Sequence, residues 1–198
     1  LYTLTLQPGS EGIDAYVWGI WEWGEPNIIC FNNYGSDSNL SIEYTEVGNG
    51  IEIIDIYKKR SYLKFNISSL PENAGIVNTI LSLYVYYLEI PPFQIDYKVN
   101  IFKVNSLWSE GGIAWYNQPQ IDDLVQGEVV VNEEEMWWDF DITSLVQYWY
   151  DSGENNGLCL KNPYENSNQF GRINMFSSDY EEDPSMRPKL KIEYNLNQ

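Results

Sequence analysis

The sequence predicts an all-β fold, a jelly-roll β-sandwich of two antiparallel sheets with one short helix at about 142–152. Apolar and polar residues alternate with a period of two in many short segments along the whole chain. Turn-forming residues such as Gly48-Asn49-Gly50 and Asn155-Asn156-Gly157 separate these segments. Because strands do not alternate with long helices, two packed antiparallel sheets are favoured over a parallel sheet.

The clearest strand covers 79–88, where alternation predicts one inward and one outward face. We expect the inward face to carry Leu81, Leu83, Val85 and Tyr87. The segments 62–67 and 189–194 follow the same rule, with the apolar residues Leu63, Phe65, Ile67, Leu190, Ile192 and Tyr194 inward. Further strands are expected at 2–6, 13–18, 39–44, 51–57, 97–104, 128–131, 136–141, 157–161 and 171–176.

One segment has the period of a helix instead. Ile142, Leu145, Val146 and Trp149 recur at i, i+3, i+4 and i+7, and Gly153 stands where a left-handed cap belongs. This pattern predicts a short amphipathic helix whose apolar stripe covers an open end of the sandwich.

The 198 residues fit a single β-sandwich domain spanning 1–198, since such folds often reach this length around one core. The first residues do not show a basic segment followed by an apolar one, which would indicate a signal peptide. We therefore expect a mature or excised module of a larger surface or secreted protein. The two cysteines, Cys30 and Cys159, are compatible with one disulfide or with two buried thiols.

The charge and the missing residue types exclude several kinds of function. Eleven Lys and Arg against 29 Asp and Glu give a net charge of −18, which repels nucleic acid and anionic lipid. No run approaches the roughly 20 apolar residues that insertion into a membrane needs. The absence of histidine excludes a Ser-His-Asp triad and a His-rich zinc site. We expect a protein that is not an enzyme, although a two-carboxylate glycosidase stays chemically open.

Three tryptophans, Trp18, Trp21 and Trp23, lie in a stretch punctuated by Gly and Pro. Trp18 continues a strand, and period two places Trp21 and Trp23 on one face. An aromatic ring on a loop can stack on the apolar face of a sugar ring, with Glu22 and Glu25 available for hydrogen bonds. The sequence thus predicts a carbohydrate platform here, and the alternative is that these rings pack under their own loop or against a neighbouring domain.

Arg60 ends the basic run Lys58-Lys59-Arg60 and is a further candidate sugar contact, or else pairs with a neighbouring carboxylate. Two other tryptophans, Trp108 and Trp115, are expected in the core. Trp137 and Trp138 are adjacent in a strand and must point to opposite faces.

Calcium is the metal that the excess of carboxylates would suit, as a structural stabiliser. No twelve-residue acidic loop between helices is present, so ligands would have to converge from separate loops. Asp14, Asn33 and Asp37 are the expected ligands because they frame one long connection between early strands. The bland alternative is that the acidic residues only keep the surface soluble.

A run of local patterns resembles a known family, the disaggregatase-related repeat or DNRLRE domain, which is similar to alginate-binding carbohydrate-binding modules. The resemblance covers nearly the whole chain and rests on the following pieces, in order: Gln7-Pro-Gly-Ser-Glu-Gly-Ile-Asp14-Ala-Tyr-Val17, Asn33-Tyr34-Gly35, Arg60-Ser-Tyr-Leu-Lys-Phe65 with Ser69-Leu-Pro71, Trp108-Ser-Glu110 with Ala114-Trp115-Tyr-Asn117-Gln-Pro119, Phe140-Asp141-Ile-Thr143-Ser-Leu-Val146 with Trp149, Phe176-Ser-Ser178, and Arg187-Pro188-Lys-Leu190. Between Val17 and Asn33 the chain is longer and more aromatic than the usual link of this family.

The resemblance implies an extracellular, secreted or cell-surface module without catalysis of its own. We therefore expect a carbohydrate-binding module for a cell-surface or matrix polysaccharide. The alternative is a structural or adhesive module of a surface layer, sheath or filament, in which neighbouring domains or surface proteins meet the exposed aromatic residues.

Overall fold

The computed structural model describes residues 1–22, 30–49, 51–91, 97–131, 133–165 and 170–197. These residues form eleven strands, one α-helix and three short 3₁₀ turns. The elements are β1 (Tyr2–Leu6), β2 (Ile13–Glu22), β3 (Asn39–Gly48), β4 (Ile53–Lys64), β5 (Ala74–Glu89), β6 (Tyr97–Val104), η1 (Glu110–Gly112), η2 (Trp115–Asn117), β7 (Ile121–Val131), β8 (Met136–Asp141), α1 (Thr143–Ser152), β9 (Leu158–Lys161), β10 (Gly171–Phe176), η3 (Pro184–Met186) and β11 (Lys189–Leu196).

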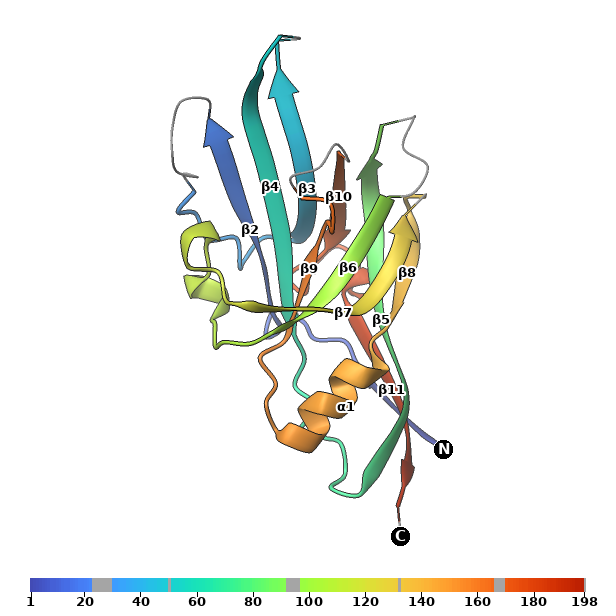
Figure 1. The fold of residues 1–198 in the computed structure, drawn as a ribbon. Helices are drawn as coiled ribbons and strands as arrows, with labels where there is room; N and C mark the ends of the chain where they lie inside the picture. The colour runs from blue at the N-terminus through green and yellow to red at the C-terminus, as the bar shows by residue number, and fades with distance from the viewer. Residues whose placement is uncertain (23–29, 50, 92–96, 132, 166–169, 198) are drawn as a thin grey trace.

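All the strand pairs are antiparallel, in the order β1-β11-β5-β10-β3-β4-β9-β6-β7, with β2 added beside β4 and β8 beside β5. The sheet curls until β7 lies against β8, which encloses the core between two facing layers (Figure 1). The predicted class, an all-β sandwich of the jelly-roll kind, is confirmed.

β4 holds the two layers together because its two halves pair with different strands. Its first half pairs with β3, and Ser61–Leu63 pair with β9 on the same side. β2 pairs along its other side from Asp55 to Lys64. The sequence predicted two strands here, 51–57 and 62–67, but the structure has one. The basic run between them continues the strand because Lys59 and Arg60 have carboxylate partners, and Lys58 lies over aromatic rings.

A β-bulge corrects one predicted face. Val85 pairs with Met175 and Tyr87 pairs with Asn174, so β5 contains one extra residue between these pairs. The extra residue reverses the alternation beyond Val85. Tyr87 is therefore 36% exposed instead of facing inward with Leu81 and Leu83, which are fully buried.

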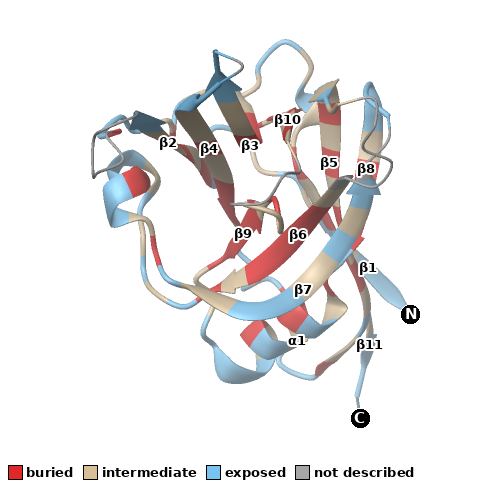
Figure 2. Ribbon diagram, turned by 45° about the horizontal axis from the view of Figure 1, so that its top comes forward, coloured by how far each residue is buried: buried red, intermediate tan, exposed pale blue. Residues whose placement is uncertain are grey.

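Two apolar clusters fill the interior. The larger joins both layers, and the smaller lies beneath β2 and η2 around Val17, Tyr62 and Trp115. Figure 2 shows that buried residues occur along strands such as β5, β6, β9 and β10 and in part of α1. Both cysteines are buried free thiols in the smaller cluster, so the second of the two alternatives holds. Trp115 is buried as expected, and Trp108 packs at the margin of the smaller cluster. Trp138 is buried and its neighbour Trp137 is only partly buried, as opposite faces require.

The helix lies where the sequence placed it, against β5 at one end of the sandwich (Figure 1). Its stripe of Ile142, Leu145, Val146 and Trp149 is buried, and Gly153 adopts a left-handed cap whose N–H donates to the Trp149 carbonyl. In the described part of the chain, no helix is long and apolar enough to span a bilayer.

Two glycines provide a matched test of this framework. Gly157 has φ +84°, and a Cβ there would lie 2.3 Å from the Leu63 carbonyl oxygen. Gly153 has φ +70°, but among the described residues no atom lies within 4 Å of its would-be Cβ. We expect Gly153→Ala to lower the free energy of unfolding by about 1 kcal/mol, from backbone strain alone. Gly157→Ala should cost about 2–4 kcal/mol, because a steric clash adds to that strain. Urea unfolding followed by tryptophan fluorescence measures both, and equal losses would contradict the packing described at Gly157.

Candidate functional site

β2 lies at the margin of its layer. β4 pairs with one side of β2, and on the other side the described residues supply only an isolated bridge between Tyr16 and Tyr34. Trp18 stands opposite Lys59 and Trp21 opposite Ile56, so the two indoles point to opposite faces of β2. The structure thus separates Trp18 from Trp21. Trp23 and Glu25, which completed the predicted platform, lie outside the described residues.

On one face of β2, aromatic rings form a continuous packed row. The rings of Tyr16 and Tyr34 stack with centroids 4.3 Å apart. Trp18 lies between Tyr34 and Tyr57, with centroids 6.3 Å and 6.4 Å away. The Lys59 ammonium group lies 5.4 Å from the Trp18 ring and pairs with Glu43 at 2.8 Å. The row is therefore held rigidly by its own neighbours.

The other face, at the end of β2, presents a more open indole. Trp21 is 37% exposed, and the neighbouring Glu22 is exposed as well. The ammonium group of Lys58 lies 4.8 Å from the Trp21 ring and 5.7 Å from the Tyr44 ring. Burial lowers the pKa of Lys58, because a charged amine loses hydration there. Lys58 therefore packs against the indole, and about a third of Trp21 stays exposed to solvent.

The sequence interpretation missed a strongly exposed aromatic pair. Phe31 and Tyr116 are 70% and 64% exposed, yet their rings meet with centroids 5.3 Å apart. Tyr116 belongs to η2, which lies against β2. The sequence did contain one indication that these rings are exposed. Phe31 directly follows Cys30 and Tyr116 directly follows Trp115, and both preceding residues pack inward. What no local pattern could show is that two segments 85 positions apart bring their rings together.

Arg60 lies among protein partners instead of in an open groove. Its Nε donates to Glu165 Oε1 at 2.9 Å, and Nη1 donates to Gln118 Oε1 at 2.9 Å. The guanidinium group also lies 4.9 Å from the centre of the Trp115 ring. Only 4% of the Glu165 side chain is exposed. These contacts bind Arg60 into the framework that holds η2.

Asp14, one of the three expected metal ligands, lies beside two carboxylates that the sequence did not single out. One oxygen each of Asp14, Glu110 and Asp179 lies within 4.8 Å of the others. Burial raises the pKa of Asp14 to about 7, hydrogen bonds from Ser178 oppose this shift, and the charges of Glu110 and Asp179 add to it. Burial also raises the pKa of Glu110 and of Asp179.

Asn33 and Asp37 lie next to these carboxylates but have other partners. The Asn33 amide donates to the carbonyls of Glu110 and Ile113 at 2.5 and 2.8 Å. Asp37 accepts the Tyr16 hydroxyl at 3.3 Å and the backbone N–H of Asn39 at 3.2 Å. With Asp179, they line a hollow of about 740 Å³ that is open to solvent.

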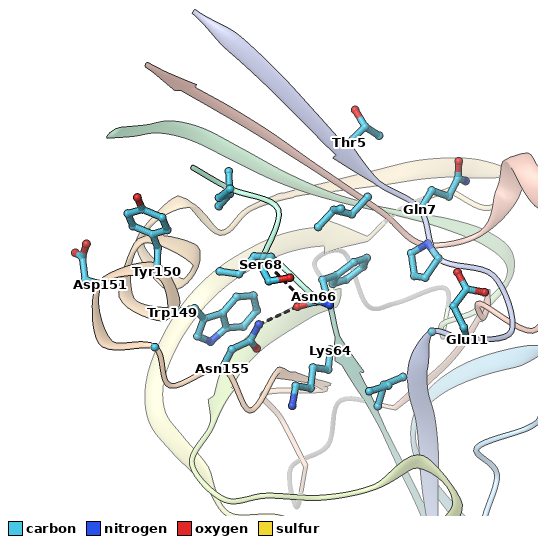
Figure 3. Close-up of a pocket in the computed structure, with 18 of the residues that line it drawn as sticks. Thr5, Gln7, Glu11, Lys64, Asn66, Ser68, Trp149, Tyr150, Asp151 and Asn155 are labelled. Carbon is cyan, nitrogen blue, oxygen red and sulfur yellow. Dashed lines mark hydrogen bonds between the residues drawn. The ribbon is translucent and has the colours of Figure 1, made fainter. Parts of the chain in front are cut away.

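A larger hollow of about 1220 Å³ lies at the helix end of the sandwich, with Trp149 and Asn155 on one side and Gln7 and Glu11 on the other (Figure 3). Its volume would admit sugar rings. However, the amides of Gln7 and Asn155 donate to backbone carbonyls of the chain. Trp149 is only 1% exposed, so this hollow offers no open indole surface.

The model of the family described as carbohydrate-binding module family 96 matches residues 30–194. No curated protein matches the chain. The matched region includes Phe31, Arg60 and Tyr116, whereas β2 with Trp18 and Trp21 precedes it. Because the match spans far more than half of the 198 residues, the chain belongs to carbohydrate-binding module family 96.

Proposed function

We propose that this chain is a non-catalytic, extracellular module that binds a polysaccharide through three exposed aromatic residues, Trp21, Phe31 and Tyr116. We call these three the edge aromatics. The observation that carries the proposal is the Phe31–Tyr116 pair, which leaves 70% and 64% of two contacting rings in water. Family membership supplies the class of ligand.

Exposed aromatic rings contribute most binding free energy when a flat apolar surface covers them. An aromatic side chain buries about 150–250 Å² when it is fully covered. Covering half of one ring at about 25 cal/mol per Å² contributes roughly 2–3 kcal/mol before the losses of binding entropy. A pyranose presents a face of C–H groups of the right size. Two or three such contacts support a modest affinity, as expected for repeated contacts along a polymer.

The charge of the molecule favours a neutral polysaccharide over an acidic one. The net charge of −18 repels a polyanion. The cations nearest the edge aromatics are already engaged, since Lys58 is buried against the Trp21 ring and Arg60 pairs with Glu165. The resemblance to the disaggregatase-related repeat and to alginate-binding modules therefore stays a prediction about ancestry and carries no argument for an acidic ligand.

Family membership supports the absence of catalysis, and the carboxylate cluster around the buried Asp14 adds no catalytic pair of its own. Glycosidases hold two carboxyl groups roughly 5–9.5 Å apart, with the scissile bond between them. The oxygens of Asp14, Glu110 and Asp179 approach within 4.8 Å, and Asp14 is 3% exposed. Because Asp14 is buried, it is not available as one of two carboxyl groups that flank a sugar.

The edge aromatics give a direct test of the proposed function. Each of Phe31→Ala and Tyr116→Ala should weaken binding to a neutral polysaccharide about tenfold or more, because each removes a stacking surface. Affinity electrophoresis against neutral and acidic polysaccharides identifies the ligand, and calorimetry measures the dissociation constant. The matched control is Tyr2→Ala, which removes an aromatic residue that is 52% exposed on β1.

Unchanged binding in both variants would contradict the assignment of the edge aromatics. If no polysaccharide binds at all and the same variants abolish self-association or adhesion instead, the alternative function, a structural or adhesive surface module, holds.

Arg60 gives a second test, which separates a sugar contact from a structural ion pair. We expect Arg60→Ala to lower the free energy of unfolding by about 3 kcal/mol, because the buried Glu165 then keeps only the longer ion pair with Lys161, at 3.9 Å. Lys191→Ala is the control, because its pair with Glu193 is solvent-exposed and contributes less than about 1 kcal/mol. Urea unfolding measures both changes. Loss of polysaccharide binding at unchanged stability would instead make Arg60 a ligand contact.

A further inference from the structure

We propose that Asp14, Glu110 and Asp179 bind one calcium ion, which ties β2 to η1 and to the loop after β10. This site is independent of the polysaccharide surface. It retains Asp14 from the ligands expected from the sequence and replaces Asn33 and Asp37 as direct ligands.

The first observation is the geometry of the three carboxylates. Calcium takes oxygen ligands at 2.3–2.6 Å, so oxygens on opposite sides of one ion lie up to about 5 Å apart. One oxygen from each of the three residues lies within 4.8 Å of the others. They come from three separate parts of the chain, and the fold alone brings them together.

A second, independent observation is an orphaned buried oxygen. Asp14 is only 3% exposed, and its Oδ2 accepts the backbone N–H of Ser178 at 2.9 Å. Its Oδ1 has no solvent access and no hydrogen-bond partner among the described residues. Buried polar atoms nearly always have partners, so an orphaned carboxylate oxygen inside a group of three carboxylates indicates a missing ligand.

The charges lead to the same conclusion. Among the ion pairs of the described residues, none includes Asp14, Glu110 or Asp179. Arg187 attracts Asp179 from a distance, but its Nε donates to the carbonyl of Tyr180. Three acidic groups that crowd together without a cation repel each other, and a divalent ion removes that repulsion.

The surroundings hold the ligands in place. Glu110 accepts the backbone N–H of Asp14 through Oε1 at 3.1 Å, and Asn33 holds the Glu110 backbone. A Cβ at Gly35 would lie 2.5 Å from both Cγ and the carbonyl oxygen of Glu110, so the chain passes too close for a side chain. Asp179 also lines the hollow of about 740 Å³, through which water and an ion can enter. Asn33 therefore positions a ligand instead of serving as one.

The ligand chemistry favours calcium over other metals. The cluster offers only carboxylate oxygens, which suit hard cations, and it contains neither sulfur nor imidazole. Magnesium demands near-ideal octahedral geometry at 2.0–2.1 Å and keeps several waters, whereas calcium accepts irregular arrangements with more oxygens. Three carboxylates on separate segments form an irregular arrangement of this kind, which suits calcium.

The test starts from protein stripped with EDTA and dialysed into metal-free buffer. We expect calorimetry with CaCl₂ to give one ion per chain. The melting temperature should rise by about 5–10 °C when calcium is a hundred times its dissociation constant. MgCl₂ at the same concentration should give a clearly smaller shift.

Asp179→Asn keeps the size of the side chain and removes one charge, and Glu182→Gln is the control, since Glu182 is an exposed acid lining the neighbouring hollow. We expect Asp179→Asn to lose the calcium-induced shift at least in large part, while Glu182→Gln retains it. Circular dichroism of the stripped proteins confirms that both variants fold.

The proposal is overturned if calorimetry of the wild-type chain detects no heat of calcium binding and calcium leaves its melting temperature unchanged. It is also overturned if Asp179→Asn and Glu110→Gln, both folded, bind calcium as the wild type does. If calcium has no effect on the wild type and the stripped Asp179→Asn variant is more stable than the wild type, the three acids share a proton instead of a metal.

Discussion

The rest of the structure depends on β4 and on the neutralisation of its basic centre. This strand pairs with β2, β3 and β9, so it is the element through which both layers and the exposed margin are joined. Three consecutive cations in a central strand would destabilise the fold without partners, since burying an unpaired charge is costly. Glu43 and Glu165, together with the rings of Trp18, Trp21 and Trp115, make the position tolerable.

The same buried contacts also hold the segments that carry the exposed aromatic residues. The pair Arg60–Glu165 and the amide of Gln118 hold the turn that presents Tyr116. Lys58 lies under Trp21. If the edge aromatics bind a sugar as proposed, ordering them beforehand avoids a loss of affinity during binding. The cations that contact these segments are engaged within the fold, which leaves few of them for an acidic ligand.

Local patterns predicted the fold well where one face of a strand is buried. The segments 97–104 and 171–176 coincide with β6 and β10, and the stripe ending at Trp149 located α1.

Prediction failed where a distant partner overrides the local signal. The run Lys58-Lys59-Arg60 looked like a break, because nothing local shows that Glu43 and Glu165 face it. The bulge before Tyr87 likewise depends on the pairing with β10. Phe31 with Tyr116, and Asp14 with Asp179, meet only in the folded chain, so no local pattern could bring these residues together.

The pairing of β1 with β11 has a consequence for the way this domain is carried. Tyr2 stands opposite Tyr194, so both ends of the chain leave the fold side by side, at the lower right of Figure 1, while η1 and η2 lie on the far left. A tether attached at either end would therefore depart from the same corner. Any partner attached at the two ends would meet the domain at this corner, away from the proposed edge aromatics on η2 and beside it.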